Sequence, residues 1–192
     1  MKKILAIFTL AVSIIALSSL VSAVGVDAVY TDDDTISFST VKELKSGSMY
    51  LYFIKEVTPT KTNYYISVLN QVSDKYYPFQ KIASIKIGSN NYPLDRVEVM
   101  DQIKLLKSLN HNRTFFQLTD NTVKAVISSN PDDQIVLSIP AASRVVINTF
   151  NINGRFREDV IKTLSASKED FSLYDKWGSS RKKNPTPESY IW

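Results

Sequence analysis

The stretch "SMYLYFIKEV" (residues 48–57) decides the fold that this sequence can form. It is apolar and aromatic from Met49 to Ile54, without the polar alternation of a strand that has one face in water. A run of this length that ends at the proline-bearing loop "TPTK" (58–61) is typical of a strand buried on both faces. We therefore expect residues 48–57 to form a strand with packed side chains on both sides of a sheet.

Segments around this stretch also have strand patterns. In "TISFST" (35–40), apolar side chains alternate with Thr and Ser, as expected of a half-buried strand. Residues 80–99 predict a hairpin, because "GSNN" (88–91) is rich in residues that tolerate a positive φ angle. The segment "NYYISVLNQV" (63–72) predicts a strand that carries Tyr64, Ile66, Val68 and Val72 on one face and Tyr65, Ser67 and Gln71 on the other.

The second half of the chain predicts further strands and two short helices. The strands are "TFFQL" (114–118) and the pair 132–140 and 143–152, which a Pro-Ala-Ala turn connects. The helices are 119–129, with an N-cap at Thr119 or Asp120, and 153–164, with Phe156, Val160 and Leu164 on one face. The segment 100–113 is compatible with either a strand or a short helix.

Together these patterns give about eight strands and two short helices. The connections are of hairpin length, and no segment has the strand–long helix–strand spacing of a parallel sheet. We therefore predict a mainly β fold, an antiparallel sandwich or partly open barrel with two short helices. This single domain would span residues 35–175, between a leader segment at 24–34 and a flexible, proline-bearing tail at 176–192.

The beginning of the chain has the pattern of a signal peptide, which we assign to residues 1–23. Two lysines precede the apolar run Ile4–Leu17, and Val21-Ser22-Ala23 offers the residue sizes that signal peptidase accepts. We therefore expect cleavage after Ala23, with a weaker second cut after Ala28. The alternative is an uncleaved anchor, because the 23 uncharged residues from Ile4 to Val26 are long enough to span a bilayer.

Composition narrows the class of protein further. The 192-residue chain has a formal net charge of +4, and cleavage would also remove Lys2 and Lys3. The charge that remains is too small to predict nucleic-acid binding. The sequence has no cysteine, so neither a disulfide nor a lipid-modified cysteine can form. We predict a secreted, periplasmic or cell-envelope protein that meets the membrane only through its signal segment, if that segment is not cleaved.

Few residues are suited to catalysis or to metal binding. His111 is the only histidine and lies in a polar turn, so we expect neither a catalytic triad nor a zinc site. The five glycines form no phosphate-binding loop, and the acidic run "TDDDT" (31–35) lacks the ligand spacing of a cation site. We expect the acid pair Asp132-Asp133 to cap a turn and Glu158-Asp159 to lie in the first turn of a helix. We therefore predict no enzyme activity, no metal and no cofactor.

Aromatic residues are the best candidates for binding. Most tyrosines of the predicted strands should be core residues or cross-strand pairs, but tyrosines that alternate on an exposed face could hold a sugar or a peptide. The cluster Tyr76-Tyr77-Pro78-Phe79 lies beside a turn and predicts an exposed aromatic patch. The predicted binding residues are therefore Tyr76, Tyr77 and Phe79.

The predicted function is that of an exported, non-enzymatic β-rich binding or structural module of the bacterial cell envelope or secretome. Its partner would be an envelope protein or glycan that the sequence does not identify. Two alternatives remain open. A soluble β-barrel carrier of a small apolar ligand would need a large apolar cavity. A carboxylate-dependent hydrolase would need two carboxylates that face each other across a cleft.

Overall fold

The computed structural model describes residues 25–30, 35–44, 49–70, 82–97, 112–140 and 147–175. Within them, nine strands form one antiparallel sheet in the order β1-β2-β3-β4-β7-β6-β5-β8-β9. The strands are β1 (Asp27–Tyr30), β2 (Ile36–Leu44), β3 (Met49–Val57), β4 (Thr62–Asn70), β5 (Ile82–Ile87), β6 (Asn90–Val97), β7 (Asn112–Gln117), β8 (Ile135–Pro140) and β9 (Ile147–Asn151). The helices are α3 (Asp120–Ile127), α4 (Gly154–Ser165), η2 (Lys168–Asp170) and α5 (Phe171–Tyr174). The sheet is open, and the predicted mainly β class is confirmed.

The strand predicted at residues 48–57 is confirmed as β3. It lies between β2 and β4 and pairs with both along its whole length. On one face Leu51 and Phe53 are 0% exposed, and on the other Tyr52 and Ile54 are 7% and 9% exposed. Because successive side chains of a strand point to opposite faces, burial on both sides explains the unbroken apolar run in the sequence.

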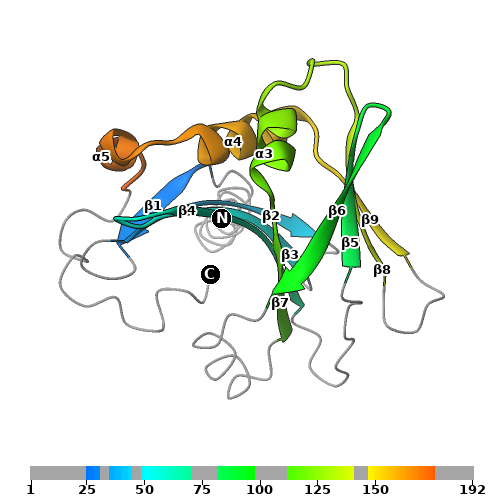
Figure 1. Cartoon of the computed structure of the whole chain (residues 1–192), viewed down its shortest axis with the longest axis horizontal. Coiled ribbons are helices and arrows are strands. Elements are labelled where there is room, and N and C mark those ends of the chain that lie inside the picture. Colours follow the sequence, from blue (N-terminus) through cyan, green and yellow to red (C-terminus); the bar gives the residue numbers. More distant parts are fainter. Residues whose placement is uncertain are drawn as a thin grey trace, which may run out of the picture.

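The sheet bends around α3 and α4, which lie on its concave side (Figure 1). We call this side the inner face. Apolar side chains of β3 to β9 pack there against Val123 and Val126 of α3 and against Val160 and Leu164 of α4. The apolar side chains between the sheet and the helices form the main core. Helices that pack on one face of a sheet commonly remove that face from water.

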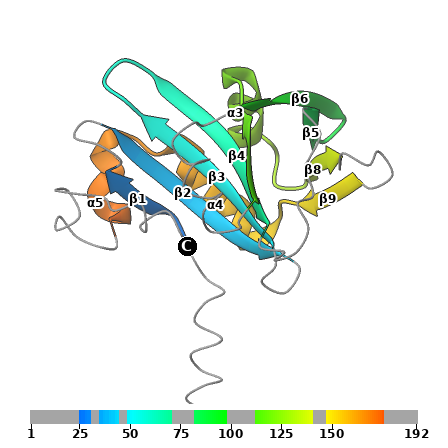
Figure 2. The ribbon, with the colours of Figure 1, turned by 90° about the horizontal axis from the view of Figure 1, so that it is seen from below.

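The bend brings the far end of the sheet close to β2, as in a partly open barrel (Figure 2). Lys42 of β2 marks the approach, because its Nζ donates a hydrogen bond to the Asn151 carbonyl oxygen of β9 at 3.4 Å. The same Nζ lies 5.4 Å from the ring centroid of Phe156 in α4, within reach of a cation–π interaction. One lysine side chain therefore bridges β2, β9 and the start of α4.

Three local predictions are confirmed. The N-cap of α3 is Thr119, whose Oγ1 accepts a hydrogen bond from the Thr122 N–H at 3.2 Å. The hairpin of β5 and β6 turns at Gly88, whose φ of 57° would strain any residue with a Cβ atom. Asp133 caps a turn, because its Oδ2 accepts a hydrogen bond from the Asn130 N–H at 2.9 Å.

The structure also departs from the sequence-based expectations. Part of the predicted leader segment 24–34 belongs to the sheet, since Asp27–Tyr30 pairs with β2 and Ala28 is fully buried opposite Phe38. The prediction for Glu158-Asp159 is wrong, because α4 begins at Gly154 and has no acidic residue in its first turn. A short strand with a single small buried residue leaves little trace in a periodicity pattern. Glu158 is the fifth residue of α4, so it lies just beyond the first turn.

Several predictions concern residues outside those described: the signal peptide 1–23, the tail 176–192, the segment 100–111, and the residues Tyr76, Tyr77, Phe79 and His111. Among the helices that are described, none is both long enough and apolar enough to cross a membrane.

Candidate functional site

A second apolar cluster lies on the outer face of the sheet, opposite the helices. We call it the outer aromatic face. It spans β2, β3, β4, β6 and β7 and consists of Tyr50, Tyr52, Ile54, Tyr65, Leu69 and Phe115, with Val41 and Val97 at its margin. The strand register brings these side chains together, since Tyr50 lies opposite Leu69 and Ile54 lies opposite Tyr65.

Tyr50 and Tyr65 are half-buried and pack against the cluster formed by the buried Tyr52, Ile54, Leu69 and Phe115. The Tyr65 ring meets the Phe115 ring edge-on, with 6.4 Å between the ring centroids. Burial raises the pKa of the Tyr65 phenol above its ordinary value, and the nearby Glu56 carboxylate adds to the increase. The phenol therefore stays protonated at neutral pH and can both donate and accept a hydrogen bond.

The helices distinguish the two faces. Their buried apolar residues belong to the main core or to a smaller cluster beside β1, formed with Ala28, Ile36 and Phe38. No helical residue within the described ranges belongs to the outer aromatic face. Tyr52, Ile54, Leu69 and Phe115 are buried, so the half-buried Tyr50 and Tyr65 are the aromatic side chains of this cluster that offer surface to a partner.

Lys55 and Tyr64 lie on the inner face and have a structural role. The Lys55 Nζ donates hydrogen bonds to the carbonyl oxygens of Leu164 at 3.1 Å and Ala166 at 2.5 Å, at the end of α4. It also lies 5.5 Å from the Tyr64 ring centroid. Burial lowers the pKa of the Lys55 ammonium, and the Asp170 carboxylate partly opposes this effect. Since carbonyl groups and a ring surround the ammonium, Lys55 acts as a cation that caps the C-terminus of α4.

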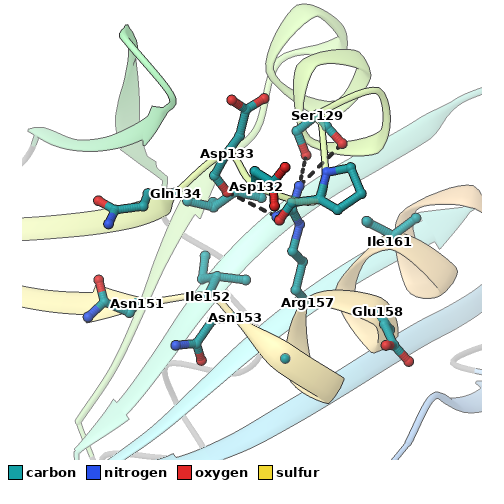
Figure 3. Close-up of a pocket in the computed structure, with 13 residues that line it drawn as sticks. Ser129, Asp132, Asp133, Gln134, Asn151, Ile152, Asn153, Arg157, Glu158 and Ile161 are labelled. Carbon is teal, nitrogen blue, oxygen red and sulfur yellow. Dashed lines mark hydrogen bonds between the residues drawn. The ribbon is translucent and has the colours of Figure 1, made fainter.

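A cavity of about 560 Å³ with a mixed polar and apolar lining lies where the loop after α3 meets the start of α4 (Figure 3). Asp132, Gln134, Asn151, Asn153 and Glu158 are among the polar residues that line it. Ile135, Ile152 and Ile161 supply apolar lining. The lining of this cavity therefore combines polar and apolar surface.

Arg157 of α4 fixes one wall of this cavity. Its Nη1 donates hydrogen bonds to the carbonyl oxygens of Pro131 at 2.6 Å and Asp133 at 2.9 Å. Its Nη2 donates to the carbonyl oxygens of Ser129 and Asn130 and, at 2.8 Å, to the Ser129 Oγ. These groups follow the end of α3, where backbone carbonyls lack helical partners. The buried guanidinium therefore holds the loop after α3 against α4.

Three carboxylates line the cavity, and two of them, Asp133 and Glu158, do not face each other. In Figure 3 the carboxylates of Asp133 and Glu158 point in opposite directions. Asp133 is also engaged in the turn at Asn130, as described above. The cavity therefore offers hydrogen-bonding groups to a polar molecule, without the facing geometry that carboxylate-dependent hydrolysis requires of this pair.

Other predicted sites can be placed only in part. Over the described ranges, no group of three or more His, Cys, Asp or Glu side chains could hold a metal ion. The predicted binding residues Tyr76, Tyr77 and Phe79 lie outside these ranges, so their role stays a prediction. In the sequence, Tyr76 comes six residues after the end of β4, the strand that contributes Tyr65 and Leu69 to the outer aromatic face.

Sequence reasoning did not single out Lys55 and Arg157. A signal for Lys55 exists, because a lone lysine in a strand buried on both faces needs a partner for its charge. No such signal exists for Arg157, whose carbonyl partners lie 24 to 28 residues earlier in the chain. Comparison with protein-family models, with curated proteins and with solved structures finds no match for this chain.

Proposed function

We propose that this chain is an exported, non-enzymatic binding module of the bacterial cell envelope or secretome, and that the outer aromatic face contacts its partner. One observation carries the proposal. Tyr50 and Tyr65 stand half-buried over a packed apolar layer, on the face of the sheet that no described helix covers. The partner would be an envelope protein or glycan.

The chemistry of this face suits such a partner. A tyrosine ring combines a large apolar area with a hydroxyl group, so it can stack on a sugar ring or pack along an extended peptide while it forms a hydrogen bond. Tyr50 and Tyr65 come from adjacent strands, whose pairing fixes the spacing between their backbones. A rigid platform lowers the entropy that binding costs.

The start of the fold favours cleavage after Ala23 over the weaker cut after Ala28. Val26 is 5% exposed and Ala28 is fully buried, so both are part of the packed structure. The weaker cut after Ala28 would divide β1 and remove both residues from the fold. The cut after Ala23 leaves β1 intact.

Capture of the partner tests the proposal. The mature chain from Val24, its Tyr50→Ala/Tyr65→Ala variant and a Leu173→Ala control would be immobilised and exposed to native envelope extract, growth medium and purified peptidoglycan. Leu173 is 74% exposed and lies on α5, away from the outer aromatic face. We expect the double substitution to reduce capture at least tenfold, since each anchor contributes about 1 kcal/mol or more. The control should bind like the wild type.

Thermal unfolding of each variant would show that it is folded. Equal capture by the wild type and the double variant would remove the outer aromatic face from the proposal. A separate Tyr77→Ala/Phe79→Ala variant tests the cluster predicted from the sequence in the same assay.

A further inference from the structure

The cavity between the loop after α3 and the start of α4 is a second candidate site, separate from the outer aromatic face. None of its described lining residues belongs to that face. Its volume of about 560 Å³ lies within the range of about 300–1,000 Å³ that is usual for small-molecule sites. Its polar lining residues Gln134, Asn151, Asn153 and Glu158 are exposed, so a dissolved molecule can reach them.

Three side-chain amides line one side of this cavity. Gln134 precedes β8, Asn151 ends β9, and Asn153 is the N-cap residue of α4. Figure 3 shows all three side chains to the left of Arg157. Among the described residues, none forms a hydrogen bond with these three amide groups. Each amide therefore offers its N–H donors and its carbonyl acceptor to a ligand.

The start of α4 adds backbone donors beside these amides. The Arg157 N–H donates a hydrogen bond to the Asn153 carbonyl oxygen at 3.3 Å, which begins the ladder of the helix. The N–H groups of residues 154–156 come before it, and the first N–H groups of a helix have no acceptor within the helix. Gly154, the first residue of α4, is exposed and lines the cavity. This side of the cavity is therefore rich in hydrogen-bond donors.

The charge of the lining selects against an acidic ligand. Asp132, Asp133 and Glu158 contribute carboxylates, whereas Arg157 is the one cation among the described lining residues. Both Nη atoms of Arg157 already donate to carbonyl oxygens of the loop after α3. A ligand that carries a phosphate or a carboxylate would therefore meet like charges without a guanidinium to pair with.

The remaining lining suits a carbon skeleton. Ile135 and Ile152 are buried and Ile161 is half-buried, and all three line the cavity. A sugar ring has C–H groups on its faces and hydroxyl groups around its rim. Its C–H groups can leave water against the isoleucines while its hydroxyls reach the polar lining. Because a hydroxyl both donates and accepts, it matches a lining that combines amide donors with carboxylate acceptors.

We propose that this cavity binds a sugar unit that carries no acidic group. Gln134, Asn151 and Asn153 donate hydrogen bonds to its hydroxyl oxygens, and the Glu158 and Asp132 carboxylates accept hydrogen bonds from its hydroxyl groups. A ligand without polar groups would leave this lining without partners where it displaces water. The site does not involve the outer aromatic face, so it is independent of the function proposed above.

Titration of the purified, ¹⁵N-labelled protein with single sugars tests the proposal. The probes are glucose, N-acetylglucosamine, glucosamine and the anionic sugar glucuronate. We expect the first three to cause saturable NMR shifts at Gly154 and at the side-chain amide of Asn153, with a Kd of about 1–10 mM. Glucuronate should bind at least about tenfold more weakly than glucose, because the carboxylates of the lining repel it.

Two substitutions assign the binding to the cavity. Asn153→Ala removes an amide that forms no capping hydrogen bond, so the variant should stay folded and lose affinity about fivefold or more. Gln134→Ala, at an exposed lining residue, should have a similar effect. The matched control is Gln117→Ala, which removes an exposed amide at the end of β7, outside the cavity, and should bind like the wild type. Thermal unfolding would show that each variant is folded.

Three results would overturn the proposal. The first is the absence of saturable shifts with glucose, N-acetylglucosamine and glucosamine up to about 50 mM, several times the expected Kd. The second is binding of glucuronate as tight as that of glucose, or unchanged affinity in both amide variants. The third is a set of shifts confined to β3 and β4 that the Tyr50→Ala/Tyr65→Ala variant abolishes, which would assign sugar binding to the outer aromatic face instead.

Discussion

The two faces of the sheet use similar side chains for different purposes. β3 supplies both faces, with Leu51 and Phe53 directed inward and Tyr50 and Tyr52 directed outward. Leu51 and Phe53 belong to the core that includes residues of α3 and α4, whereas the outer cluster with Tyr50 and Tyr52 contains no residue of a described helix. The difference teaches that burial alone does not separate a core from a recognition surface. To tell the two apart, one also has to consider whether another element covers the face and which polar groups lie at its surface.

Phe53→Ala should have the largest effect on stability. Phe53 is fully buried on the inner face and meets Phe156 of α4 edge-on, with 6.0 Å between the ring centroids. Its truncation leaves a cavity and should lower the free energy of unfolding by about 3–5 kcal/mol in urea titrations. Tyr50→Ala, on the outer face of the same strand, should cost about 1 kcal/mol or less. Similar losses would mean that the outer aromatic face is a second core.

Arg157→Met should have the next largest effect, because Arg157 ties α4 to the loop after α3 on the inner side. The substitution leaves several carbonyl oxygens without a donor and should lower the free energy of unfolding by about 3 kcal/mol. The matched control is Arg155→Met, an exposed arginine in the first turn of the same helix. A loss of the same size in both variants would show that helix charge, not the loop contact, is responsible.

Lys55→Met should cost less, about 1–2 kcal/mol, although Lys55 is also buried on the inner face. Methionine preserves much of the apolar stem, but the carbonyl oxygens of Leu164 and Ala166 lose their donor. Removal of a buried charge also removes its desolvation cost, which offsets part of the loss. A gain in stability on chemical unfolding would indicate that this desolvation cost exceeds the capping contribution.

A pH titration of stability should show the smallest effect and involves one tyrosine from each face. Burial raises the pKa of the Tyr64 phenol, and the Asp120 carboxylate adds to the increase. Burial also raises the pKa of the Tyr65 phenol, and there the Glu56 carboxylate adds to the increase. The folded state therefore disfavours both phenolates. The resulting stability is fully present below the ordinary pKa of about 10 and is lost as the pH rises through the higher folded values.

Urea unfolding midpoints at pH 9 and at pH 11 would measure this loss of stability. The Tyr64→Phe/Tyr65→Phe variant should lose less stability between the two pH values than the wild type. Lys55 acts in the opposite sense, because its lowered pKa makes stability increase as the pH rises toward the ordinary lysine value. Both chains retain Lys55, so its contribution cancels. An identical loss in the two chains would contradict the assignment to these tyrosines.

The sequence predicted the parts of the fold that strong local patterns determine. The unbroken apolar run of β3, the turn at Gly88 and the N-cap at Thr119 each have a local physical cause, and each is confirmed. The order of the strands and the bend of the sheet depend on contacts between distant segments. Alternation within one strand does not encode them.

The candidate site could be predicted only in outline. The separation of Tyr64 from Tyr65 onto opposite faces followed from the period of a strand. The period of a strand does not determine which of these two faces the helices cover.

Site-specific photocrosslinking tests the central claim most directly, namely that the outer aromatic face contacts a partner. A photoreactive amino acid would replace Tyr50 in one chain and the exposed Leu173 in another, and both would be irradiated in the producing cells. The account predicts a discrete crosslinked adduct from position 50 and none from position 173. The absence of an intermolecular adduct at position 50, or equal adducts at both positions, would contradict it.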